Sequence, residues 1–89
     1  MEMTVPTAQR YAIDVVYNGI TKVLEIEAHE SVASVLQRAI QLFGVTQQPH
    51  LLSLFTADNT VISEGESAFR AGLKSGVHVY LRPNVVKGG

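Results

Sequence analysis

The sequence contains no cysteine, which excludes disulfides, thiolate metal sites and a cysteine nucleophile. It also lacks an excess of charge. The net charge of -1 gives no basic face for nucleic acid or for an anionic membrane. No apolar run reaches the roughly 18 residues that span a bilayer, and residues 1–10 contain no apolar signal core. We therefore expect a cytoplasmic protein.

Residue patterns that carry chemistry are equally scarce. The histidines, His29, His50 and His78, have no helical spacing to one another, so we interpret them as surface residues and not as metal ligands. No serine has the sequence context of a catalytic triad, and the glycine-lysine segments lack the spacing of a phosphate loop. The sequence predicts neither enzyme activity nor a bound metal or cofactor.

What is present is the composition of one small folded domain. The 89 residues are 46% apolar and 17% charged, which is typical of a compact globular chain. Residues 1–10 lack periodicity and are expected to form a flexible leader. Periodic segments fill residues 11–82, the predicted domain. Pro83 has no amide hydrogen and should end the last strand, which leaves residues 83–89 as a flexible tail.

Two local patterns predict a hairpin followed by a helix. Residues 11–27 contain two alternating runs separated by Asn18-Gly19, the dipeptide that best tolerates a two-residue hairpin turn. Ser31 can then cap a helix that Gly44 closes. One face of that helix is apolar at the period of an α-helix, through Val32, Val35, Leu36, Ala39, Ile40 and Phe43.

Three further strands are predicted after the helix, in residues 50–56, 60–63 and 77–83. Between the last two lies a glycine-rich loop that we expect Phe69 and Leu73 to anchor. In the last strand, alternation directs one set inward, Val77, Val79 and Leu81, and another outward, His78, Tyr80 and Arg82. The expected fold is α+β, in which a mixed five-stranded sheet of order β-β-α-β-β-β packs on one helix.

These segments resemble the ubiquitin-like β-grasp family over about residues 11–89. The stretches that carry the resemblance are "LEIEAHESVASVLQRAI", "LSLF", "AGLKSGVHVYLR" and the final "GG". Within the family, the chain looks most like small bacterial ubiquitin-like modifiers that work with adenylating enzymes, conjugating-type enzymes and JAB-type peptidases. The resemblance implies a protein modifier that other proteins act upon.

The resemblance implies that the functional group is the carboxylate of Gly89, next to Gly88. An adenylating enzyme would activate it, and transfer through a thioester would end in an isopeptide bond to a target protein. Glycine suits this role because a residue without Cβ admits close neighbours. Recognition of the tail would fall to Arg82, Val85, Val86 and Lys87. The Pro83-Asn84 insertion makes this tail longer than ubiquitin's, which suggests a dedicated partner.

A second site implied by the resemblance is a partner-binding patch on the sheet, formed by Leu54, His78 and Tyr80. The run "LLSLF" does not reveal its buried face, so Leu54 is alternatively a core residue. Two other functions share the fold. A sulfur carrier would convert the same tail to a thiocarboxylate, and a non-covalent interaction domain would not use the tail at all.

Overall fold

The computed structural model of the chain describes residues 10–84. Residues 1–9 and 85–89, which hold most of the predicted leader and tail, lie outside this range. The elements follow one another in the order β1 (Arg10–Tyr17), β2 (Ile20–Glu27), α1 (Val32–Phe43), the 3-10 helix η1 (Pro49–Leu51), β3 (Leu52–Phe55) and β4 (His78–Pro83).

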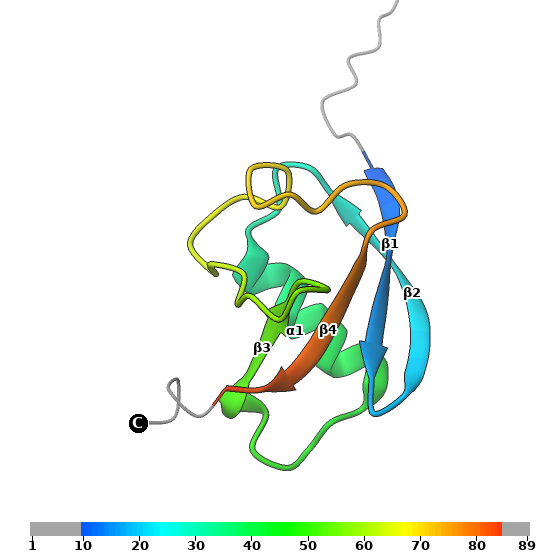
Figure 1. Cartoon of the computed structure of the whole chain (residues 1–89), viewed down its shortest axis with the longest axis vertical. Helices are drawn as coiled ribbons and strands as arrows, with labels where there is room; N and C mark the ends of the chain where they lie inside the picture. The colour runs from blue at the N-terminus through cyan, green and yellow to red at the C-terminus, as the bar shows by residue number, and fades with distance from the viewer. Residues whose placement is uncertain (1–9, 85–89) are drawn as a thin grey trace, which may run out of the picture.

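One helix covers one face of a mixed sheet, as the sequence predicts (Figure 1). The sheet order is β2-β1-β4-β3, and the first and last strands, β1 and β4, pair in parallel at its centre. The other two pairings are antiparallel. Parallel neighbours need a long crossover, and the segment that contains α1 and β3 supplies it.

The signals for the hairpin and the helix ends are confirmed. Asn18 and Gly19 adopt φ angles of 55° and 82°, the left-handed values that a tight hairpin turn requires. The Ser31 hydroxyl accepts a hydrogen bond from the Ser34 N–H at 3.1 Å and so caps α1. Gly44, with φ of 65°, closes its other end.

The predicted strand at residues 60–63 does not form, so the described sheet has four strands and not five. Val61 makes only an isolated bridge to Phe55. The segment after Val61 leaves the sheet, and two of its backbone carbonyl groups bind the start of α1 instead. The oxygens of Glu66 and Glu64 accept hydrogen bonds from the first N–H groups of α1, at Val32 and Ala33, at 2.8 and 3.2 Å. The loop thereby satisfies donors that a helix start leaves unpaired.

The core lies between α1 and the sheet, and it corrects the prediction that Leu54 lies on the surface. Leu54 is completely buried. It stands opposite Leu81 in the β3–β4 register, and residues directly opposite in an antiparallel pair share a face. Since Leu81 points toward α1, Leu54 does so too, and Phe55 takes the outward position. The largest buried side chains are Ile13, Ile26, Leu36, Leu54, Leu73 and Leu81.

The glycine-rich loop is anchored by Leu73 and Ala68, both buried, but not by Phe69. The Phe69 side chain is 57% exposed, so its predicted anchoring role is wrong. The Tyr11 hydroxyl also holds this loop to β1, because it donates a hydrogen bond to the Leu73 carbonyl. Ala68 packs against the core instead. It is a smaller residue, and the sequence around it has no periodic pattern that would predict its burial.

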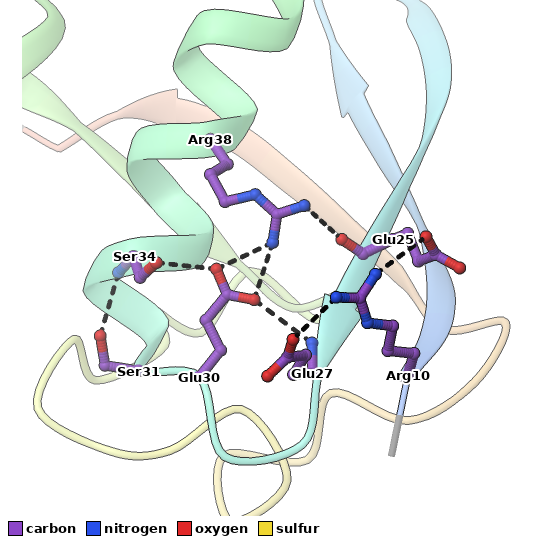
Figure 2. Close-up of polar contacts among 7 residues, drawn as sticks. All are labelled: Arg10, Glu25, Glu27, Glu30, Ser31, Ser34 and Arg38. Atoms are coloured by element: carbon purple, nitrogen blue, oxygen red, sulfur yellow. Dashed lines mark hydrogen bonds and ion pairs between the residues drawn. The ribbon is translucent and has the colours of Figure 1, made fainter. Parts of the chain in front are cut away.

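A charged cluster joins β2 to the start of α1 (Figure 2). The Glu30 carboxylate accepts hydrogen bonds from Arg38 at 2.7 and 2.9 Å, from the Ser34 hydroxyl at 2.7 Å and from the Glu27 N–H at 3.2 Å. Partial burial would by itself raise the pKa of Glu30. The hydrogen bonds from Arg38, Ser34 and Glu27, with the positive charge of Arg38, outweigh burial and lower that pKa.

The core placement of Leu54 predicts a large loss of stability in Leu54→Ala. Removing a fully buried leucine side chain usually costs about 2–5 kcal/mol. Val61→Ala, at a side chain that is 47% exposed, should change the free energy of unfolding by no more than about 0.5 kcal/mol. Urea denaturation measures both. Equal, small losses in the two variants would place Leu54 on the surface after all.

The lowered pKa of Glu30 predicts a specific dependence of stability on pH. The carboxylate stabilises the fold above its unfolded-state pKa of about 4.3, and this contribution is lost as the pH falls through the lower folded-state pKa. Glu30→Gln should therefore be less stable than the unsubstituted chain at neutral pH, and the gap should close in acid.

Urea denaturation between neutral and acidic pH measures that gap. Ser34→Ala removes one of the hydrogen bonds to Glu30 but keeps the backbone N–H that Ser31 caps, so it should give a smaller gap of the same sign. A gap that does not change with pH would show that the Glu30 charge contributes nothing to stability.

Candidate functional site

An apolar row crosses the outer face of the sheet, opposite α1. The strand registers place Val16 opposite Tyr80, Tyr80 opposite Phe55, and Phe55 opposite Val61. We call these four residues the outer apolar row. Val61 is 47% exposed and the other three are half-buried. A row of large side chains that remains open to solvent is the kind of surface that binds a protein partner.

Two predicted patch residues, His78 and Tyr80, do point outward on β4. His78 lies next to the row, opposite Asp14 of β1 in the parallel register, and its Nε2 is 3.5 Å from an Asp14 carboxylate oxygen. Leu54 does not join them, because it lies on the buried face. Phe55, the next residue, occupies the place beside Tyr80 that the sequence assigned to Leu54.

Arg82 extends the outer face toward the end of β4. Its guanidinium lies over the Tyr80 ring, 5.0 Å from the ring centroid, and donates a hydrogen bond to the Asn59 side-chain oxygen. A cation over an aromatic ring contributes about 0.5–1 kcal/mol at an exposed site. Asn59 has a left-handed φ of 70° in the turn after β3, which sets its position. Arg82 is thus held against the sheet face near the start of the tail.

β4 ends at Pro83, as the sequence predicts, and one more backbone contact follows the strand. The Asn84 N–H donates to the Leu51 carbonyl at 2.7 Å, and the Asn84 side-chain amide reaches the Ser53 hydroxyl at 3.4 Å. Pro83 stands opposite Leu52 at a position between two hydrogen-bonded pairs, so its missing N–H removes no bond of the ladder. The body therefore holds the chain up to Asn84.

The other predicted tail residues, Val85, Val86, Lys87, Gly88 and Gly89, lie outside the described residues. Within the described part, a hollow lies between the hairpin turn at residues 17–19 and the end of β4 at residues 80–83. Val16 and Tyr80 of the outer apolar row line it as well. The row, the hollow and the start of the tail consequently form one continuous surface.

Residues 10–84 hold neither a metal-binding cluster nor a membrane-spanning helix. In this range, no three His, Asp or Glu side chains come together in a way that could bind a metal ion. The single α-helix of the same range, α1, is too short to cross a bilayer. The outer face of the sheet, with the outer apolar row, is the candidate functional site.

Comparison with known proteins gives no matching family model and no matching curated protein. Solved structures do match in shape. The N-terminal ubiquitin-like domain in the 4931431F19Rik protein superposes with a TM-score of 0.74 at 10% identity, covering 94% of this chain and 84% of that one. This chain has a ubiquitin-like fold.

Two other solved structures share that fold. A de novo design based on ubiquitin matches with a TM-score of 0.71 at 13% identity, covering 83% of this chain and 88% of that one. ATBAG1, solved in complex with HSP70, matches with a TM-score of 0.73 at 12% identity. That match covers 88% of this chain but 42% of the ATBAG1 chain, so the present chain spans less than half of that neighbour. Identities this low show the fold alone.

The sequence missed Val16, Phe55 and Val61 as surface residues. Alternation requires that either Leu54 or Phe55 face outward, but only the register that places Phe55 opposite Tyr80 decides which of them does. No local signal identified Val61, whose exposure follows from the isolated bridge that replaced the predicted strand.

Proposed function

We propose that this chain is a ubiquitin-like protein modifier of the bacterial type, conjugated through the carboxylate of Gly89. An adenylating enzyme forms the acyl-adenylate from ATP, with loss of pyrophosphate. A conjugating-type enzyme takes the acyl group as a thioester, with release of AMP, and a target lysine amine then displaces the thiol to form an isopeptide bond. A JAB-type peptidase would cleave that bond, or trim any extension beyond Gly89.

The observation that carries the proposal is the hydrogen bond from the Asn84 N–H to the Leu51 carbonyl, just beyond the last β3–β4 pair. It fixes the last described residue before the Gly-Gly sequence to the body. Five residues follow Asn84, and an extended chain of five residues spans at most about 17 Å. This length suits the delivery of a terminal carboxylate into an enzyme crevice while the domain binds outside it.

The outer face supports the same function because it adjoins the start of the tail. Tyr80 of the outer apolar row and Arg82 lie on β4, the strand that leads into the tail, so an enzyme could hold the face and the tail together. Binding of both parts by one enzyme raises the effective concentration of the carboxylate at its active site. A domain that binds partners without conjugation would gain nothing from this adjacency.

A non-covalent interaction domain is the second candidate, favoured by the outer apolar row itself. That surface is complete within residues 10–84 and needs no tail. The similar fold of ATBAG1, solved in complex with HSP70, agrees with a domain that binds another protein. In this case the partner would contact Tyr80 and Phe55, and the glycines would have no role.

Deletion of Gly88-Gly89 separates these functions. We expect the tagged chain, expressed in its own host, to form covalent adducts that disappear after the deletion, while folding is unchanged because the sheet and the core are complete within residues 10–84. Trypsin cuts after Lys87 and would leave Gly-Gly on the modified lysines, where mass spectrometry detects it. Tyr80→Ser, with an intact tail, is the matched control for the surface.

Each other result points to a different function. A terminal sulfur in place of oxygen, without adducts, would identify a sulfur carrier and contradict the modifier proposal. Capture of a partner that survives the deletion but is lost in Tyr80→Ser, again without adducts, would identify a non-covalent domain. For a modifier, Tyr80→Ser should slow adduct formation without abolishing the chemistry at Gly89.

A further inference from the structure

The strand β2 forms one outer edge of the sheet, and half of its backbone groups face away from β1. The Glu25 carbonyl and the Glu27 N–H point outward, because side chains of the helical segment bind both. Outward direction alternates along an antiparallel strand, so the backbone groups of Thr21 and Val23 point outward as well. Such an edge is a template for another strand.

Arg38 and Glu30 close one part of this edge (Figure 2). Arg38 donates to the Glu25 carbonyl at 2.6 Å, and Glu30 accepts from the Glu27 N–H at 3.2 Å. The ion pair between the two side chains, at 2.7 Å, joins these contacts into one unit, which we call the edge clamp. Charge-assisted hydrogen bonds are about twice as strong as neutral ones, so the edge clamp binds the Glu25 carbonyl and the Glu27 N–H strongly.

The rest of the edge is open within residues 10–84. No described hydrogen bond reaches the outward N–H or carbonyl group of Thr21 or Val23. The Val23 side chain is 63% exposed, among the largest apolar exposures in this part of the chain. An open edge with an apolar side chain at its middle is suited to strand addition.

We propose that the Thr21–Glu25 edge is a self-pairing surface for a second copy of this chain, and that the edge clamp keeps it closed. The register follows from two-fold symmetry. With Val23 opposite its own copy, Thr21 lies opposite Glu25 of the second copy, and each pair exchanges both backbone hydrogen bonds. The Thr21 N–H then needs the Glu25 carbonyl oxygen, which is the atom that Arg38 occupies.

The side chains of this register favour a second copy over an unrelated strand. On the outer face, Val23 packs against Val23, and Thr21 lies opposite Glu25. On the other face, Lys22 lies opposite Leu24. No like charges stand directly opposite each other, which is the arrangement that an antiparallel pair requires. The edge is therefore complementary to itself in charge and in apolar surface.

The edge clamp competes with this pairing for the Glu25 carbonyl, and its hydrogen bond has the advantage of being intramolecular. Arg38 reaches the Glu25 carbonyl without the loss of translational and rotational freedom that a second molecule incurs. Glu30 holds the guanidinium in place through two hydrogen bonds. We infer that the unsubstituted chain is monomeric, and that loss of the Arg38 donors uncovers an acceptor which the second copy then binds.

The test is the self-association of Arg38→Met, which keeps an unbranched side chain but removes every donor. Sedimentation velocity from micromolar to millimolar concentration should show a monomer for the unsubstituted chain and a dimer for the variant, with association strengthened about tenfold or more. Arg70→Met is the matched control, because it removes the same charge from an exposed loop position and should remain monomeric.

A second substitution tests the register. Val23→Lys in the Arg38→Met background places two positive charges opposite each other and should restore the monomer. Hydrogen exchange gives an independent readout: the Thr21 and Val23 N–H groups should exchange rapidly in the unsubstituted chain and become protected in the dimer. Should Arg38→Met fail to fold, Glu30→Gln carries the test, because it removes the charge that holds Arg38.

Three outcomes would overturn the proposal. The first is a folded Arg38→Met chain that sediments like the unsubstituted one. The second is a dimer that survives Val23→Lys, which would place the contact elsewhere. The third is an Arg38→Met chain that binds strands of other proteins but not its own copy, which would contradict the self-pairing register.

Discussion

The position of β4 between β1 and β3 is the constraint on which the rest of the structure depends. Its parallel register with β1 and its antiparallel register with β3 direct Val79 and Leu81 toward α1 and His78, Tyr80 and Arg82 away from it. Each residue of β1 or β3 that lies directly opposite one of these side chains is on the same face of the sheet as that side chain. The core and the candidate site are two sides of one strand, so a change of register by one residue would exchange them.

The same strand also places Asn84, the last described residue, against the body. β4 ends at Pro83, and a backbone hydrogen bond to Leu51, the residue before β3, holds Asn84. Tyr80 of the outer apolar row lies on this strand, close to Asn84 in the sequence. The outer face of the sheet and the segment that precedes the Gly-Gly sequence, which the sequence presents separately, are thus adjacent through β4.

How much of this the sequence predicts depends on whether the signal is local. Asn18-Gly19, Ser31 and Gly44 act on their own neighbours, and the structure confirms the turn and both helix ends. The faces of β3 were not predictable, since apolar residues occur on both sides of "LLSLF" and only pairing with a distant strand decides between them. The missing fifth strand has a similar cause, because the start of α1 uses carbonyls of the loop that follows Val61. The edge clamp had no sequence signal either, since Arg38 meets a backbone carbonyl of β2.

The central claim, that the outer face and the tail act as one recognition unit, is tested most directly by trapping. The chain would be prepared with a cysteine-reactive group in place of the Gly89 carboxylate and incubated with an extract of its host. The account predicts covalent capture of an enzyme through its active-site cysteine, and much slower capture when Tyr80 is replaced by serine. Capture that is indifferent to Tyr80, or no capture of any cysteine enzyme, would contradict it.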